Sequence, residues 1–230
     1  MDASAIGIKV GLELLRRTAP TGLAWLTTYT RGIELLIIGP GGAGKTSISD
    51  YLEFGILEEE GHHEKTLDIQ KSTAFAISVG RDAALKLRIR RTVDVPGQTG
   101  PVEHANLIRE RRPHAVLIVL DGTHTCKQLA EWMDPFCERL DHLLREDKRV
   151  ARKLRGIVVA LNKRDRVRRT TDYDARKRQV RSCLVNGLSE VLGRQFAKSI
   201  STLPTVAVQS KHGTTMLDAL IRKIARQLAK

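Results

Sequence analysis

Aromatic residues and cysteines are scarce in this sequence of 230 residues. Phe, Trp and Tyr make up 4% of the chain, so we expect an aliphatic core, which the hydrophobic fraction of 41% can supply. The three cysteines, Cys126, Cys137 and Cys183, lack the paired spacing of a metal site. An odd and sparse cysteine count is typical of free thiols in a reducing compartment, so we expect a cytoplasmic protein.

Membrane-spanning runs and targeting signals are also lacking. The apolar stretch Ile6–Leu15 is far too short to cross a bilayer, and it does not have the features of a secretory signal. Asp2 occupies the position at which N-myristoylation requires glycine, and residues 226–230 contain no cysteine for prenylation. We therefore expect a protein without a transmembrane segment or a lipid anchor.

Acidic residues are outnumbered, with 26 Asp and Glu against 39 Lys and Arg, which gives a net charge of +13. Residues 145–181 alone hold 15 basic and 5 acidic residues. This excess favours an anionic partner, such as a membrane surface, a nucleic acid backbone or an acidic protein. A solvated basic face without a dedicated partner is the alternative. No aromatic residues are interleaved for base stacking, which disfavours specific binding of single-stranded nucleic acid.

What is present is an alternation of short apolar runs and longer helical patterns. The expected strands are Ile33–Ile38, 73–79, 85–93, Ala115–Leu120, Ile157–Leu161 and Thr205–Val208. The expected helices are 46–57, 103–112, 126–152, 172–199 and 214–228. This order predicts an α/β fold with three layers: a doubly wound, mostly parallel, six-stranded sheet with one antiparallel edge strand. Residues 1–31 are expected to be an N-terminal extension, and residues 32–230 a single domain.

Residues 39–46, with the sequence GPGGAGKT, match the phosphate-loop pattern G-x-x-x-x-G-K-[ST]. They follow an expected strand and open an expected helix, which is the structural context that this motif requires. Glycines allow backbone N–H groups to turn toward phosphate oxygens, and the helix N-terminus adds partial positive charge. We expect Lys45 to reach the β- and γ-phosphates and the Thr46 hydroxyl to bind Mg²⁺. The motif leaves the choice between ATP and GTP open.

Residues 94–98, with the sequence DVPGQ, follow the expected strand 85–93. A carboxylate at Asp94 can hold a water bound to Mg²⁺, and Gly97 can offer its backbone N–H to the γ-phosphate. A Pro-Gly turn alone is common. Its position about fifty residues after a phosphate loop makes it a candidate part of the same site.

Residues 162–165, with the sequence NKRD, follow the buried run Ile157–Leu161. The carboxylate of Asp165 could accept hydrogen bonds from both N1–H and the exocyclic amine of guanine, a pairing that adenine cannot make. Asn162 and Lys163 would brace the base pocket. At the end of a buried strand, this tetrapeptide favours guanine over adenine.

Over residues 33–228 these motifs resemble those of the Ras-like small GTPases, a group of P-loop GTPases in the TRAFAC class. The VPGQ sequence and the lack of lipidation signals make the chain similar to prokaryotic small GTPases such as the MglA group. The resemblance implies that Gln98 orients the attacking water. It also implies a first-switch threonine on Mg²⁺ and the γ-phosphate, for which Thr73 is preferred over Thr66. Gln209, Ser210 and Lys211 resemble the motif that places backbone against the guanine.

The resemblance therefore predicts a P-loop GTPase fold and an enzyme that binds GTP or GDP, with Mg²⁺ as its cofactor, and hydrolyses GTP. It also predicts that the protein acts as a conformational switch for an effector or regulatory protein. The expected catalytic residues are Gln98 and Lys45, and the expected metal-binding residues are Thr46, Thr73 and Asp94. The expected nucleotide-binding residues are Gly39, Gly41, Gly42, Ala43, Gly44, Lys45, Thr46, Ser47, Thr73, Gly97, Asn162, Lys163, Asp165, Gln209, Ser210 and Lys211. Two other hypotheses are a GTP-gated scaffold that does not hydrolyse GTP and acts through its basic surface, and an ATPase.

Overall fold

The computed structural model describes residues 33–55, 57, 70–71, 75–79, 85–94, 99–210 and 212–228, with the backbone alone described for 70–71, 75–79 and 85–94. The predicted N-terminal extension lies outside these residues. Five predicted site residues, among them the alternative threonine of the first switch, also lie outside them: Thr66, Thr73, Gly97, Gln98 and Lys211.

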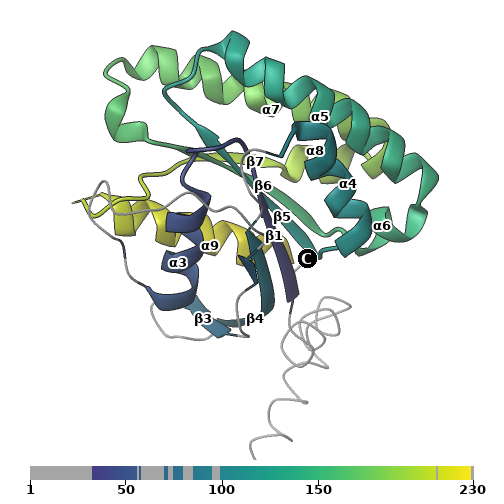
Figure 1. Ribbon diagram of the computed structural model, residues 1–230, viewed down its shortest axis with the longest axis horizontal. Coiled ribbons are helices and arrows are strands. Elements are labelled where there is room, and N and C mark those ends of the chain that lie inside the picture. The colour runs from purple at the N-terminus through teal and green to yellow at the C-terminus, as the bar shows by residue number, and fades with distance from the viewer. Residues whose placement is uncertain are drawn as a thin grey trace, which may run out of the picture.

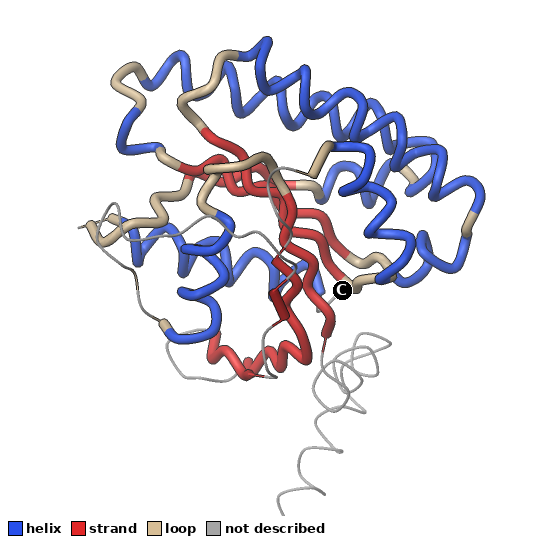
Figure 2. The backbone as a smooth tube through the Cα atoms, viewed as in Figure 1, coloured by secondary structure: helices blue, strands red, loops and turns tan. Residues whose placement is uncertain are grey.

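Seven strands of the described chain form one sheet (Figure 2). They are β1 (Ile33–Ile38), β2 (Gln70–Lys71), β3 (Phe75–Val79), β4 (Leu85–Asp94), β5 (Ala115–Asp121), β6 (Gly156–Asn162) and β7 (Ser201–Pro204). The strand order is β2-β4-β1-β5-β6-β7, and β3 also pairs with β4. Neighbours from β4 to β7 are parallel, whereas β2 and β3 run antiparallel to β4.

Helices cover both faces of the sheet (Figure 1). On one face lie α3 (Lys45–Phe54) and α9 (Gly213–Leu228), and on the other α4 (Pro101–Arg111), α5 (Cys126–Glu146), α6 (Lys148–Lys153), α7 (Thr170–Leu192) and α8 (Arg194–Ser199). This arrangement confirms the predicted α/β class with a parallel sheet between helices. None of the helices in the described part of the chain combines the length and apolar character that crossing a membrane requires.

The strand β1 shows why the sheet is covered twice. Its side chains alternate between two aliphatic clusters, since successive residues of a strand point to opposite faces. Leu36 and Ile38 pack into the cluster beneath α4, α5 and α7, while Leu35 and Ile37 pack into the one beneath α3 and α9. All four are fully buried, and each such side chain contributes about 1.5–3 kcal/mol of transfer free energy.

Two predicted helices are each divided in the structure. The pattern 126–152 becomes α5 and α6, because the backbone leaves helical geometry at Asp147, whose side chain then caps α6 by accepting from the N–H of Arg149 at 2.9 Å. The pattern 172–199 becomes α7 and α8, separated by Gly193 with φ of +81°. Periodicity continues through such breaks because the helices on both sides pack on the same face of the sheet.

The last strand lies earlier than predicted. The run Thr205–Val208 was expected to be a strand, but β7 ends at Pro204 and the run is a loop. Thr205, Val206 and Ala207 are nevertheless buried. A buried apolar run is typical of a central strand, but here Thr205 and Ala207 are held by hydrogen bonds to Leu161 and Asn162 at the end of β6.

Candidate functional site

The phosphate-loop residues join the end of β1 to the start of α3, as the sequence predicts. Gly39 and Gly44 have φ of +144° and +93°, values that side-chain-bearing residues rarely adopt. A Cβ at Gly39 would overlap the carbonyl oxygen of Val119, and one at Gly44 would overlap the side-chain amide of Asn162. Both glycines are therefore required by conformation and by close approach, while Gly41 and Gly42 are exposed on the loop.

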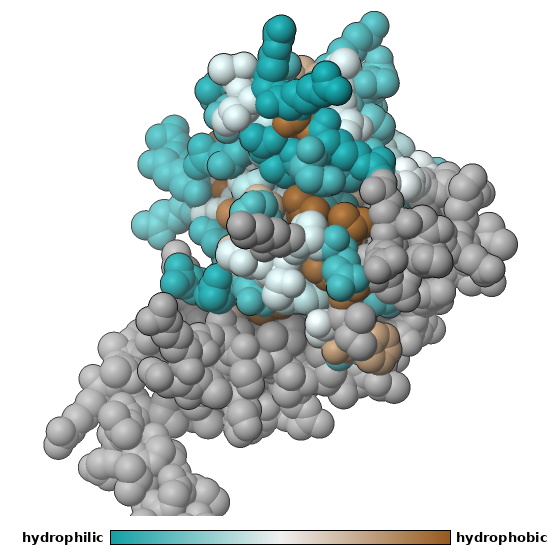
Figure 3. Space-filling view, turned by 90° about the vertical axis from the view of Figure 1, so that its left-hand side faces the viewer, coloured by the Kyte–Doolittle hydropathy of each residue, from teal (hydrophilic) through white to brown (hydrophobic). Residues whose placement is uncertain are grey.

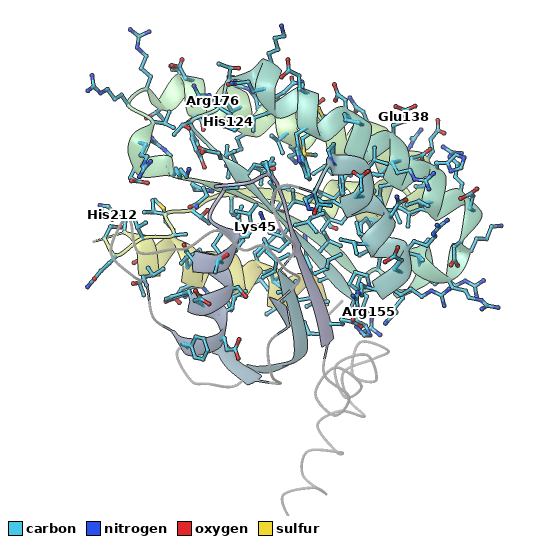
Figure 4. The ribbon with its side chains drawn as sticks, in the orientation of Figure 1. Lys45, His124, Glu138, Arg155, Arg176 and His212 are labelled. Carbon is cyan, nitrogen blue, oxygen red and sulfur yellow. The ribbon has the colours of Figure 1, made fainter. Side chains whose placement is uncertain are left out.

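Lys45 is the first residue of α3, and its side chain is turned back into the loop. It is 6% exposed, and its Nζ donates hydrogen bonds to the carbonyl oxygens of Gly39 and Pro40, both at 3.0 Å. The ammonium group is thereby held at the N-terminus of α3, near the centre of Figure 4. Thr46 and Ser47 complete the first residues of α3, with Thr46 half-buried and Ser47 buried. A cation and a helix N-terminus at one place attract anions.

Asn162 connects the phosphate loop to the loop after β7. Its Nδ2 donates to the carbonyl oxygen of Ala43 at 2.9 Å. Its Oδ1 accepts from the backbone N–H of Ala207 at 3.0 Å and lies 3.4 Å from the hydroxyl of Thr205. The Asn162 side chain is 3% exposed, and its described hydrogen bonds all join these two loops. Three segments that are far apart in the sequence therefore share one buried amide.

Lys163, the next residue, has φ of +58° and forms an ion pair across the strand ends. Its Nζ lies 2.7 Å from Asp121 Oδ2, and Thr123 donates to Asp121 Oδ1 from its N–H at 2.9 Å and its hydroxyl at 2.6 Å. Burial acts to raise the pKa of Asp121, but the hydrogen bonds from Lys163 and Thr123 together outweigh it and hold that pKa below its usual range. Asp121 is therefore a fixed anion that positions Lys163.

Asp165 is exposed, as are Gln209 and Ser210 of the segment predicted to place backbone against guanine. Asp165 lies in a short 3₁₀ helix (Arg164–Arg166), with its side chain exposed. Gln209 and Ser210 are exposed as well, and the Ser210 hydroxyl accepts from the N–H of Gly213 at 3.0 Å, at the start of α9. The contacts described for the loop after β7 thus reach Asn162 from Thr205 and Ala207, whereas Ser210 contacts α9.

Asp94 is placed by backbone pairing alone. It is the last residue of β4, and its Cα is paired with that of Ile37, one residue before the end of β1. It therefore lies at the edge of the sheet where the phosphate loop begins. In the described part of the chain no group of three or more His, Cys, Asp or Glu side chains could hold a metal ion. Of the predicted metal-binding residues, Thr46 and Asp94 are the two within that part.

Sequence reasoning missed Asp121, Thr205, Ala207 and Tyr173. Asp121 and Asn162 are register partners on β5 and β6, so Asp121 stands at the same strand end as the predicted motif and could have been found by that rule. Tyr173 is buried in α7 and donates from its hydroxyl to the carbonyl oxygen of Leu161 at 2.6 Å. Its contact depends on the packing of α7, and the sequence contains no signal for it.

Compared with models of protein families and with curated proteins, the chain matches none at a significant level.

Proposed function

We propose that the chain binds guanine nucleotides and hydrolyses GTP as a switch. The bridge from Asn162 to Ala43 and Ala207 carries the proposal. It ties the phosphate-binding motif to the base-selecting motif through a buried side chain, as a site for both ends of one nucleotide requires. A polar loop that matched the pattern by chance would have no reason to bury its amide against the phosphate loop.

The topology supports a GTPase-type fold. Strand β1 lies between β4 and β5 in the sheet. The other strands that precede β5 in the chain lie on one side of β1, and β5 and the later strands lie on the other, so the strand order reverses direction at β1. Ligands of open α/β sheets bind beyond the carboxyl ends of the strands at such a reversal. On β4, the pairs Gln70 with Asp94 and Phe75 with Ile89 belong to one antiparallel register. We infer from this register that β2 and β3 belong to one antiparallel edge strand, which makes the sheet six strands wide.

The nucleotide would lie across the carboxyl edge with its phosphates at the N-terminus of α3. Lys45 would exchange its bonds to the carbonyls of Gly39 and Pro40 for phosphate oxygens, a change that requires only its flexible side chain to turn. Asp165, exposed beyond β6, would accept the two N–H groups of guanine. Lys163, held by Asp121, would lie beside the base.

The residues present fit Mg²⁺, which prefers hydroxyl, carboxylate and phosphate oxygens. Thr46 opens α3 and Asp94 ends β4, so a hydroxyl and a carboxylate come from the two elements that flank the loop. When bound, the ion would neutralise charge on the β- and γ-phosphate oxygens. Thr73 is proposed as a third residue of this set.

A nucleotide competition experiment tests the proposal. We expect labelled GDP to bind the full chain and to be displaced by GTP far better than by ATP. Lys45→Ala should abolish binding, whereas Lys127→Ala, which removes an exposed lysine on α5, should leave binding unchanged. Thermal melting of both variants checks that the fold is retained. Equal displacement by ATP would show that Asp165 does not select guanine, and tight binding by the Lys45 variant would refute the phosphate-loop assignment.

Hydrolysis is tested separately with Gln98. Removing the side chain that orients water in Gln98→Leu should slow single-turnover GTP hydrolysis by roughly tenfold or more, with GTP affinity retained. Turnover by the wild-type protein at background, even with candidate partners, would instead favour the scaffold that does not hydrolyse GTP. A pull-down with the GTP-locked variant is the direct search for an effector.

A further inference from the structure

A polar hollow lined by arginines lies beside the turn that follows Asp165. Its volume is about 260 Å³, and its lining residues are Thr123, Arg166, Val167, Arg168, Arg169, Asp172 and Arg176. We call it the arginine pocket. Four guanidinium groups and one carboxylate give its walls a formal charge of +3. Lys45, Asn162 and Lys163 are not among the lining residues, so it is distinct from the proposed nucleotide site.

The lining residues of the arginine pocket come from the loop after β5, the turn between β6 and α7, and the first turns of α7. In Figure 1 the start of α7 lies at the left-hand end of the molecule, on the face of the sheet opposite α3. Figure 4 labels Arg176 on α7 and Lys45 on α3, on opposite sides of the sheet. Figure 3 faces this end, and hydrophilic residues cover its upper part.

Fixed contacts shape the walls of the pocket. Arg176 donates to the carbonyl oxygen of Gly122 at 2.6 Å, which holds α7 against the loop that bears Thr123. Arg164 donates to the carbonyl oxygen of Val167 at 2.6 Å and to the Thr170 hydroxyl at 3.1 Å, and lies over the ring of Tyr173. The turn that carries Arg166, Arg168 and Arg169 is therefore fixed before any ligand binds.

The same turn leads into α7 without a side-chain cap among the described residues. The N-cap position is Arg169, a residue that cannot accept the N–H groups of the first turn. Arg169 at this end is also unfavourable for the helix dipole, and Asp172 in the first turn offsets it in part. An anion in the arginine pocket would relieve both, because it accepts hydrogen bonds and lies at the positive end of the helix.

We propose that the arginine pocket binds a phosphate group that carries two or more negative charges, such as a phosphomonoester or a pyrophosphate. Arginine forks match phosphate oxygens in pairs, and several guanidinium groups can share one dianion. The volume is below the roughly 300–1,000 Å³ of pockets for drug-sized ligands, which suits a charged headgroup rather than a large organic molecule. Asp172 opposes the anion, and the remaining charge of +3 favours a ligand with more than one negative charge over a monoanion.

Titration calorimetry with inorganic pyrophosphate tests this proposal. Because pyrophosphate would also bind a phosphate loop, the measurement uses the Lys45→Ala variant of the full chain. We expect one remaining pyrophosphate site, and we expect Arg168→Gln with Arg169→Gln to weaken it by about tenfold or more, since charge-assisted hydrogen bonds are the strong ones. The matched control is Arg178→Gln with Arg181→Gln, which removes the same charge from exposed positions further along α7 and should leave affinity unchanged.

Two further arms keep the test decisive. If the Lys45 variant does not fold, an NMR titration of the wild type with pyrophosphate locates the site. Shifts of the side-chain signals of Arg168, Arg169 and Arg176 would place it in the arginine pocket. Shifts of the backbone amide signals of Gly42 and Gly44 would place it in the phosphate loop. Vesicles of phosphatidylcholine with phosphatidic acid, compared with phosphatidylserine of equal charge, identify a lipid headgroup as the source. Binding of pyrophosphate, or of vesicles that contain phosphatidic acid, supports the proposal if it depends on Arg168 and Arg169.

Three outcomes would overturn the proposal. They are an equal loss of pyrophosphate affinity in the Arg178 and Arg181 control, no binding of pyrophosphate or vesicles, and binding of homopolymeric RNA alone. GTP binding does not enter these outcomes. The arginine variants are expected to bind GTP normally, and the Lys45 variant is expected to lose GTP while keeping the arginine pocket. Failure of one proposal is therefore distinguishable from failure of the other.

Discussion

The side-chain amide of Asn162 donates to the carbonyl oxygen of Ala43, which lies 119 residues earlier in the chain, at 2.9 Å. This bond joins the end of β6 to the phosphate loop. With the bond from Ala207, it makes the geometry of the loop depend on the packing of β6 and on the loop after β7.

Replacing this asparagine should therefore affect both stability and binding. In Asn162→Ala, the carbonyl of Ala43 and the N–H of Ala207 lose their partner in a buried site. We expect the free energy of unfolding to fall by about 2–3 kcal/mol, since leaving buried groups unsatisfied costs about 1–3 kcal/mol. Urea denaturation measures it, and affinity for labelled GDP should fall in parallel.

Asn186→Ala is the matched control. Asn186 lies exposed on α7, and its amide contacts only the hydroxyl of Ser182 among its described hydrogen-bond partners. We expect its unfolding free energy to stay within about 0.5 kcal/mol of the wild type. Equal effects of the two substitutions would show that the bridge does not hold the phosphate loop.

The ion pair between Asp121 and Lys163 predicts a pH-dependent contribution to stability. The pKa of Asp121 is lowered in the folded state, so its ionised form stabilises the fold above the unfolded-state pKa of about 3.9. This stabilisation is lost as pH falls through the lower folded-state pKa. Asp121→Asn should therefore cost about 2 kcal/mol near neutral pH, with the difference from wild type shrinking below about pH 4.

Urea denaturation over a pH series measures that difference. Glu190→Gln serves as the comparison, because Glu190 is 79% exposed and its pairing with Arg145 should contribute little. A difference between wild type and Asp121→Asn that stays constant down to the acid limit would contradict the ion-pair account.

Gly44 should be intolerant of any side chain. Gly44→Ala must adopt φ near +93° and place its Cβ against the Asn162 amide, so we expect both reduced stability and loss of GDP binding. Gly193→Ala measures the cost of a positive φ without a steric overlap. Gly193, between α7 and α8, has φ of +81° with open space around it. We expect Gly193→Ala to cost about 1–3 kcal/mol, because φ of +81° with ψ of 150° is a conformation essentially restricted to glycine, and to leave nucleotide affinity unchanged. Equal nucleotide affinity in the two variants would refute the close approach at Gly44.

The sequence by itself determined the α/β class, the limits of β1 and the place of the glycine-rich loop 39–44 between β1 and α3. These follow from local physics: a compact aliphatic run makes a buried strand, and glycines allow the positive φ values that the loop adopts. Asn162 and Lys163 were also placed correctly at the end of β6, because the apolar run before them ends where the strand ends.

Only the tertiary structure decided what those residues contact. The partners of Asn162 are 119 and 45 residues away, and the partner of Lys163 is 42 residues away, so no local pattern contains them. The run Thr205–Val208 shows the same limit, because Thr205 and Ala207 are buried where they bond to Leu161 and Asn162 at the end of β6, not within a strand. The arginine pocket likewise exists only because α7 folds back to bring Arg176 onto Gly122, beside arginines that the sequence shows merely as a basic stretch.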